Sequence, residues 1–349
     1  MNASDIAVRY LLLPLGIAVA MYILVHFQLL LLNKLLDFGI THQRRTKINL
    51  MTFFVSFFVV LALVALVAVW AVQSGEEDWV SLRRAENMQL AAKTWLGVES
   101  GEALAMRALS ADDPAYDSLD EDWAQLTPPF PVDDGVIAGR IEDANRYLNL
   151  NDLVDASGKA QADVVAVFKR LFTRLQLDAR LVDALVDWMD TDREPYGSGG
   201  AEESAYANRP YHIKNAPLDS LNELLLVQGF EPAMLDALRK VVIARPSTVL
   251  SAVNINTAPA DVLLSLADNI PQGDVEAMIS GRESTPYKNI GDLTAGGLNQ
   301  WVSTVKPGLM TTKSDAFLIR VEARFDRARW AEEMLLARQG DAFQVLSRR

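Results

Sequence analysis

The apolar run at residues 48–72 constrains the fold more than any other stretch of the chain. It reads INLMTFFVSFFVVLALVALVAVWAV and is long enough to cross a lipid bilayer. No proline follows it before Leu109, so the run is predicted to continue as one helix over residues 48–109. Such a helix is apolar where it crosses the membrane and amphipathic beyond it. The sequence therefore predicts a membrane-anchored chain.

The part of this helix beyond the membrane carries one apolar stripe. Its members recur at helical spacing, so they share a face. A stripe of this kind is a docking surface, either for a sheet of the same chain or for helices of partner proteins, and nothing in it suggests a cofactor. We assign it to partner binding. The predicted partner-binding residues are Met88, Ala92, Trp95 and Val98.

A further apolar segment lies upstream, at residues 10–32, and it too is long enough to span a bilayer. The linker after it is basic, whereas only Arg9 precedes it. By the positive-inside rule the linker is cytoplasmic, so residues after about 73 lie across the inner membrane, in the periplasm of a Gram-negative cell. Residues 1–47 are then an extra span and linker, unless the natural start lies downstream. The basic linker residues are Lys34, Arg44, Arg45 and Lys47.

Composition excludes several classes of active site. The chain has no cysteine, three histidines and a net charge of −12. The lack of cysteine excludes disulfides, thiolate catalysis and cysteine-ligated zinc. His212 is the one histidine beyond the second apolar run, and a lone loop histidine is more often a surface residue than a general base. We therefore predict a protein that is not an enzyme and that does not bind nucleic acid chiefly through phosphates.

The loop Asp187–Asn215 is crowded with carboxylates, which repel one another unless a cation or open solvent screens them. Hard cations such as calcium prefer several oxygen ligands from a loop of this kind. It is not an EF-hand, because Pro195 stands where that motif requires glycine. Spacing alone leaves a calcium site and a hydrated acidic loop equally open. The carboxylates are Asp187, Asp190, Asp192, Glu194, Glu202 and Glu203.

The rest of the chain separates into strand-like and helical segments. Residues 110–150 read as an acidic, proline-rich loop followed by a strand. Residues 151–245 read as helical around the acidic loop, and residues 246–312 as a second helical unit with Thr257 as a helix N-cap. Residues 313–349 return to alternating strand patterns. The predicted fold is α+β, with a long N-terminal helix on a small antiparallel sheet and a large all-α insertion.

Two stretches of the helical segments resemble helix-hairpin-helix modules, at residues 217–241 and 274–293. Such modules often bind DNA through backbone amides and basic side chains. The hairpin NIPQGD, however, places Asp274 close to where a phosphate would lie. We interpret both stretches as compact packing units. A membrane-tethered DNA receptor is kept as an alternative, and a metal-dependent enzyme at the acidic loop as a weaker one.

Four blocks, in order, resemble the K-type minor pseudopilins of the bacterial type II secretion system, across roughly residues 80–345. The first is similar to the family's helix after the membrane segment, and the second to its strand ending in an Asn-Leu-Asn turn. The third is the most specific, and the fourth matches the start of the second helical unit. They are RRAENMQLAAKTWLGVESGEALAMRAL, RIEDANRYLNLNDL, DWMDTDREPYGSGGAEESAYANRPYHIKNAPLDSLNELLLVQGF and VNINTAPADVLL.

This resemblance implies a pilin-like fold and a place at the tip of a short pseudopilus. There the family starts and caps filament assembly with the I-type and J-type minor pseudopilins, above the inner-membrane secretion platform. The resemblance also favours calcium in the insertion. The implied ligands are Asp190, Asp192, Glu202 and Glu203, with Asp187 as a ligand or a residue that supports them.

The N-terminus departs from the family pattern. The family's leader is short and basic and ends in glycine, where a prepilin peptidase cuts just before the apolar helix. Here no Gly or Ala lies between Ile40 and Leu61, and an additional apolar segment stands upstream. Cleavage with release into a filament and permanent anchoring by two spans both stay open.

Overall fold

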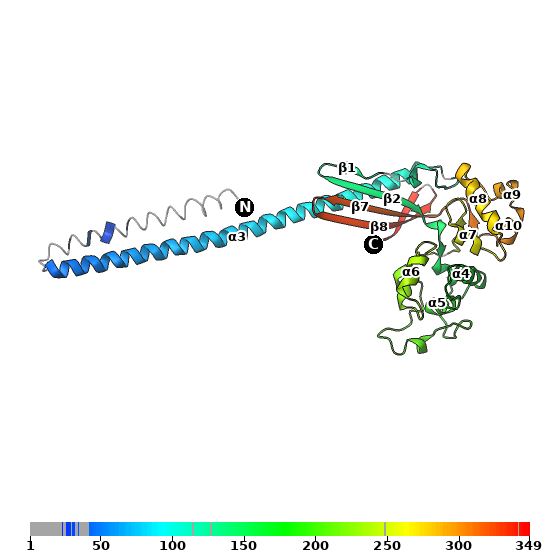
Figure 1. Ribbon diagram of the computed structural model, residues 1–349, viewed down its shortest axis with the longest axis horizontal. Coiled ribbons are helices and arrows are strands. Elements are labelled where there is room, and N and C mark those ends of the chain that lie inside the picture. Colours follow the sequence, from blue (N-terminus) through cyan, green and yellow to red (C-terminus); the bar gives the residue numbers. More distant parts are fainter. Residues whose placement is uncertain are drawn as a thin grey trace. The chain divides into compact units, whose positions relative to one another are not determined.

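The computed structural model describes residues 42–349 except 114, 126, 127, 248 and 341, with a few residues between 23 and 34 (Figure 1). The predicted span at residues 10–32 falls mostly outside the described residues. Helix α3 runs without a break over His42–Ser110, as the absence of proline predicts. Within it, Phe53–Trp70 is long and apolar enough to cross a membrane, with a mean hydropathy of 2.9.

The chain divides into two compact units, Met1–Gln89 and Leu90–Arg349. The second unit contains the end of α3, a five-stranded antiparallel sheet in the order β1-β2-β7-β8-β9, and the helical insertion. Two strands precede the insertion and three follow it, which confirms that the chain leaves the sheet and returns to it. The strands are β1 Phe130–Val132, β2 Gly135–Asp143, β7 Ala316–Phe325, β8 Ala328–Gln339 and β9 Ala342–Arg348.

The end of α3 packs on one face of this sheet, chiefly against β7 (Figure 1). Val98 is fully buried at the contact. Two glycines bring the backbones close together: a Cβ on Gly101 would lie 2.5 Å from Val321 Cγ1, and one on Gly97 would lie 2.8 Å from Ala323 Cβ. Glycine weakens a helix by roughly 1 kcal/mol relative to alanine. Here that cost is offset by the packing of helix on strand that glycine permits.

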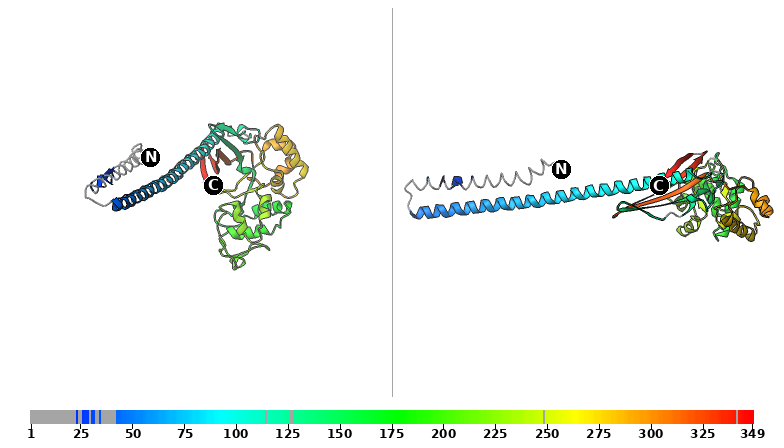
Figure 2. Two further views of the ribbon diagram at one scale, coloured as in Figure 1. Left: turned by 60° about the vertical axis from the view of Figure 1, so that its left-hand side comes forward. Right: turned by 90° about the horizontal axis from the view of Figure 1, so that it is seen from above.

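The insertion lies between β2 and β7 and forms two groups of short helices beyond one end of the sheet (Figure 2). The groups, drawn in green and in yellow to orange, share one continuous apolar core. Arg170 of α4 also reaches across, with Nε 2.8 Å from the carbonyl oxygen of Ser265. The helices are α4 Ala162–Arg174, α5 Leu181–Met189, α6 Pro232–Leu238, α7 Ala260–Ser265, α8 Gln272–Ser284, α9 Gly291–Ala295 and α10 Asn299–Thr304.

Short parallel strand pairs and buried asparagines fix the irregular backbone of the insertion. Asn151 donates through Nδ2 to the carbonyls of Leu218 and Arg245, at 3.0 and 3.1 Å. Asn254 donates to the Asp143 carboxylate at 2.9 Å. Buried backbone groups outside regular elements need such partners. The pairs are β3 Leu148–Asn149 with β4 Val242–Ile243, and β5 Val253–Asn254 with β6 Met310–Thr311.

Two local predictions were wrong. Thr257 does not cap a helix, because its hydroxyl donates to Asp143 Oδ2 at 2.5 Å and α7 begins after Pro259. The stretch Leu221–Leu226 forms a 3₁₀ helix, η6, where the apolar pattern favoured an α-helix. The Glu223 carboxylate accepts the N–H of Asp219 at 2.9 Å, which is a contact at the start of η6. The segment winds more tightly than an α-helix would.

Candidate functional site

Helix α5 directs three carboxylates toward the loop that follows it. Asp183 and Asp187 lie one turn apart, and Asp190 caps the end of the helix, so all three project from one side. Their exposed fractions are only 1%, 0% and 3%. Burying a charged carboxylate is unfavourable unless hydrogen bonds, a counter-charge or a metal compensates it. Each of these side chains therefore needs a partner in or beside the loop.

Asp187 organises the loop through its backbone. Its Oδ1 accepts the N–H of Tyr196 at 2.8 Å, and its Oδ2 accepts the N–H of Ala201 at 2.5 Å. Gly200 is required here, because a Cβ at that position would lie 2.6 Å from Asp187 Oδ2. One turn earlier, Asp183 forms an ion pair of 2.6 Å with Lys169. Both aspartates thus have partners, and they hold the loop in place.

Asp190, Asp192 and Glu202 converge inside this loop. Each offers a carboxylate oxygen, and these oxygens all lie within 4.8 Å of one another. Asp190 and Glu202 are 3% and 7% exposed, yet Asp190 Oδ1 and both Glu202 oxygens accept no hydrogen bond. Asp192 is exposed and accepts the N–H of Glu194 at 2.8 Å. The buried oxygens of this cluster are therefore the ones that lack a partner.

The electrostatics of the cluster favour a cation or a proton. Burial raises the pKa of Asp190 to about 7, and the charges of Asp192, Asp187 and Glu202 add to the effect. Burial also raises the pKa of Glu202, again with help from the neighbouring carboxylates. A divalent cation would relieve both the repulsion and the missing hydrogen bonds. The donors are all oxygens, which fits calcium and not a metal that prefers nitrogen or sulfur.

Glu203 points elsewhere, although the family resemblance implied that it is a ligand. Its Oε1 lies 2.5 Å from Nδ1 of His212, and its Oε2 accepts the N–H of Ile213 at 3.2 Å. This carboxylate raises the pKa of His212, which is itself exposed. Of the five predicted metal residues, the structure thus brings three together, uses Asp187 to hold the loop, and directs Glu203 away.

The predicted partner-binding stripe divides between two faces of α3. Met88 and Trp95 are 73% and 50% exposed, and Ala92 is exposed as well. Leu96, which is not one of the predicted stripe residues, is 55% exposed. Val98 is instead 0% exposed, in the core between helix and sheet. Val98 therefore packs within the chain, and the other three predicted residues lie outside that core.

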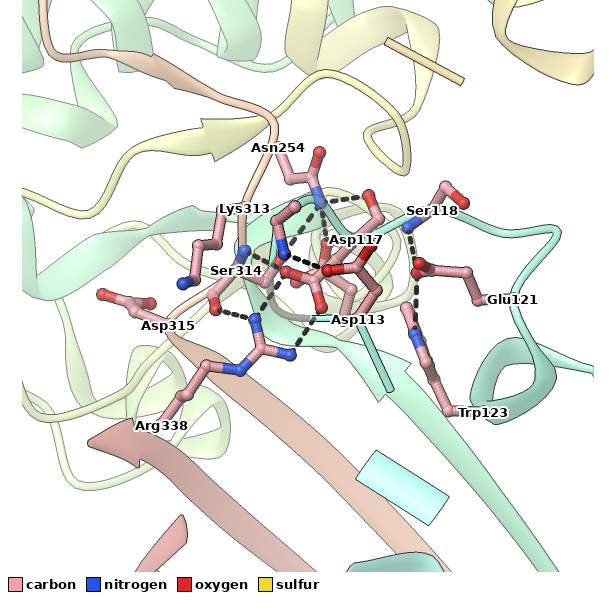
Figure 3. Close-up of polar contacts among 12 residues, drawn as sticks. Asp113, Asp117, Ser118, Glu121, Trp123, Asn254, Lys313, Ser314, Asp315 and Arg338 are labelled. Carbon is pink, nitrogen blue, oxygen red and sulfur yellow. Dashed lines mark hydrogen bonds and ion pairs between the residues drawn. The ribbon is translucent and has the colours of Figure 1, made fainter. Parts of the chain in front are cut away.

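The structure adds a second acidic cluster, formed by Asp112, Asp117 and Glu121 in a segment whose sequence predicts only a loop. Asp117 is fully buried against the guanidinium of Arg338 (Figure 3). Glu121 accepts hydrogen bonds at 2.8 and 3.0 Å from the N–H of Ser118 and the indole N–H of Trp123. Arg338 lies 221 residues after Asp117, so no local pattern could have revealed the pair.

Comparison with known proteins places the chain in a family. Two family models, both described as type II secretion system (T2SS), protein K, match residues 146–247 and 253–308. A type II secretion system protein K from Aeromonas hydrophila is 30% identical over 315 residues, which cover 83% of this chain and 94% of that protein. The chain belongs to the type II secretion system protein K family. Protein K from Klebsiella pneumoniae is 29% identical over 73% of this chain and 82% of its own.

Membership of the protein K family confirms the resemblance found in the sequence blocks. A chain in the crystal structure of the GspK-GspI-GspJ complex from enterotoxigenic Escherichia coli matches with a TM-score of 0.66 and 25% identity. The match covers 76% of this chain and 98% of that one, and it supports the mixed architecture of helix and antiparallel sheet. Protein K is a component of a secretion system and not a known class of enzyme. The apolar segment of α3 is consistent with membrane anchoring.

Proposed function

We propose that this chain is a minor pseudopilin at the tip of the type II secretion pseudopilus. It helps to initiate and cap filament assembly for the export of folded proteins across the outer membrane. The apolar segment of α3 anchors it in the inner membrane, and the unit Leu90–Arg349 lies in the periplasm. Its partners are the I-type and J-type minor pseudopilins and the inner-membrane secretion platform. The DNA-receptor alternative gains no support from the comparisons.

The main support for this proposal is that the end of α3 has one side covered by the sheet and another side that is exposed. Its inner side is covered by the chain's own sheet, with Val98 in the core. Its outer side leaves Trp95 and Leu96 half exposed, although large apolar side chains are usually buried. Ala92 is exposed one turn before them, and apolar side chains gathered on one side of a helix in this way support a protein interface. The matched solved chain comes from a complex with two other components, which fits helices of partners against this side.

Co-purification tests the proposal. The full chain, carrying Trp95→Asp, is co-expressed with I-type and J-type minor pseudopilins and purified in detergent. We expect partner recovery to fall at least tenfold, because a carboxylate would be buried in an apolar contact. Trp330→Asp is the matched control, since Trp330 is 51% exposed but lies on β8. Undiminished recovery with Trp95→Asp, or equal loss with both variants, would count against a helix-mediated interface.

The proposed role of calcium is to hold the insertion in one shape. Asp190, Asp192 and Glu202 supply the carboxylate oxygens, and Asp187 keeps the loop closed around them. The support is the pair of buried side chains whose oxygens accept no hydrogen bond. A loop stabilised in this way would present a rigid surface at the tip of the filament.

A further inference from the structure

A cavity of about 600 Å³ lies between the helical group that contains α6 and the face of the sheet that points away from α3. Successive side chains of a strand point to opposite faces of a sheet. Phe317 and Leu336 belong to the core beneath α3, so their neighbours Leu318 and Leu335 face the cavity. Of the described residues that line it, none belongs to the carboxylate cluster or to the exposed side of α3. A volume of this size is typical of sites for small ligands.

Three arginines line this cavity, and they come from both of its sides. Arg239 directly follows α6, whereas Arg320 lies on β7 and Arg349 directly follows β9. Arg320 forms ion pairs with two carboxylates, at 2.9 Å from Glu142 and 2.6 Å from Glu333. Its charge is therefore neutralised within the chain.

Arg239 and Arg349 lack such partners. Arg239 donates through Nη2 to the neutral amide oxygen of Asn222 at 2.6 Å, and Asn222 lines the same cavity. Arg349 is held through its backbone, which exchanges hydrogen bonds of 2.9 and 2.8 Å with the backbone of Glu333. In the part of the chain that the structure describes, neither guanidinium forms an ion pair with an aspartate or a glutamate.

The two carboxylates that line the cavity already have cationic partners. Glu333 is paired with Arg320, and Asp219 lies 2.8 Å from Nζ of Lys214. The hydrogen bond from Lys214 lowers the pKa of Asp219, and the charge of Arg349 adds a smaller effect. The cavity thus keeps two arginines without a carboxylate, although the chain as a whole has a net charge of −12.

The lining of the cavity combines hydrogen-bond donors with apolar side chains. The guanidinium groups supply charge-assisted donors, and the hydroxyl residues Ser220 and Ser347 line the cavity as well. Leu221 and Ile243 are half-buried in the same lining. Guanidinium donors match the two oxygens of a carboxylate, and the apolar side chains favour an apolar group attached to it. An inorganic anion would satisfy only the donors.

We infer that this cavity binds a carboxylate that is attached to an apolar group. Arg239 and Arg349 hold the carboxylate, and Leu221 and Ile243 contact the apolar group. Two kinds of molecule share this chemistry, namely the C-terminal residue of a polypeptide and a free aliphatic acid. Either ligand ties the helical insertion to the sheet, because the two arginines come from different sides of the cavity.

Isothermal titration calorimetry of the full chain in detergent tests this inference. The probe is N-acetyl-leucine, which carries both a carboxylate and an apolar group, and we expect saturable binding at about one site per chain. N-acetyl-leucinamide lacks the charge and acetate lacks the apolar group, so each should bind at least about tenfold more weakly. Titrations with hexanoate and with the tripeptide N-acetyl-Ala-Ala-Leu distinguish the two sources, because the tighter ligand shows whether a free acid or a polypeptide end fits better.

Variants of the two arginines locate the site. Arg239→Met and Arg349→Met should each weaken the binding of N-acetyl-leucine by about 10- to 100-fold, because each removes charge-assisted hydrogen bonds. Arg209→Met is the matched control and should bind as the unaltered chain does, since Arg209 is exposed and lies outside the cavity. No saturable binding to the unaltered chain overturns the inference, however the variants fold. Equal binding of the acid and its amide, or an equal loss in all three variants, overturns it as well.

Discussion

Arg338 and Asp117 form a buried bidentate ion pair, in which Nη1–Oδ2 and Nη2–Oδ1 are both 2.7 Å (Figure 3). Arg338 lies on β8, and Asp117 lies in the segment that leaves α3. The side chains are 6% and 0% exposed, so water does not screen them. Asp117 Oδ2 also accepts the N–H of Ser314 at 2.7 Å. One carboxylate thus joins the segment after the helix to two other parts of the sheet region.

Replacing Arg338 with Met should lower the free energy of unfolding by about 3–5 kcal/mol, because the Asp117 carboxylate is then buried without a counter-charge. Urea denaturation of the full chain in detergent measures the change. Arg329→Met is the control, since it breaks a pair with Glu322 whose side chains are 65% and 39% exposed. That control should cost far less, because water screens an exposed ion pair. Equal losses of unfolding free energy would show that the buried pair contributes no more to stability than the exposed pair.

Calcium should raise the melting temperature of the full chain, and chelation should lower it. A ligand at 100 times its dissociation constant stabilises the folded state by about 2.7 kcal/mol, which corresponds to roughly 5–10 °C for a unit of this size. Thermal unfolding with calcium and with chelator measures the difference. The physical reason is that only the folded loop brings Asp190, Asp192 and Glu202 together.

Two neighbouring residues make this calcium test specific. Glu202→Gln should abolish most of the calcium response, because Glu202 is buried in the cluster with both oxygens free. Glu203→Gln should keep it, because Glu203 is exposed and paired with His212. An unchanged melting temperature on chelation, or an equal response in the two variants, would refute calcium binding at this cluster.

Stability should fall as pH rises from about 5 to about 8, in part because of Glu121. Burial raises the pKa of Glu121 to about 7, above the ordinary value of 4.5 for a glutamate. A carboxyl group whose pKa is higher in the folded chain than in the unfolded chain adds to stability at pH below 4.5. That contribution is lost as the pH rises through 7. Burial likewise raises the pKa of Asp112 and of Asp143 to about 6.

The variant Glu121→Gln isolates this effect. Its amide oxygen can still accept the hydrogen bonds of Ser118 and Trp123, both of which go to one oxygen, Oε2. The variant should match the unaltered chain at pH 5 and be more stable than it at pH 8. Denaturation curves at both pH values measure this. A variant that is equally or less stable at pH 8 would contradict the prediction.

Gly101→Val should destabilise the chain by about 1–3 kcal/mol beyond its effect on helix propensity, because it overpacks the contact with Val321. Ala103→Val places the same side chain on the exposed side of α3 and should cost about 0.5 kcal/mol. Thermal unfolding of both variants separates packing from propensity. If Gly101→Val is no worse than Ala103→Val, the close approach of helix and strand is not required.

Features that depend on neighbours along the chain could be predicted from the sequence. The absence of proline predicted α3, and the alternation at Phe317–Ala323 predicted a strand of β7. The carboxylates after α5 predicted a cluster, because helix spacing and a short loop limit how far they can separate. The sequence blocks also predicted the protein K family, which the comparisons confirm. In each case a few adjacent residues carry the information.

The tertiary structure decided which of the neighbouring side chains in these segments are buried and which are exposed. It buries Glu202 and turns the adjacent Glu203 to His212, and on α3 it buries Val98 while Trp95 stays exposed. It also joins Asp117 to Arg338, two residues that no local pattern connects. The sequence by itself determined the helix, the strands and the acidic loop, because these follow from local spacing. Burial and ion pairing follow from contacts between distant segments, and those exist only once the chain has folded.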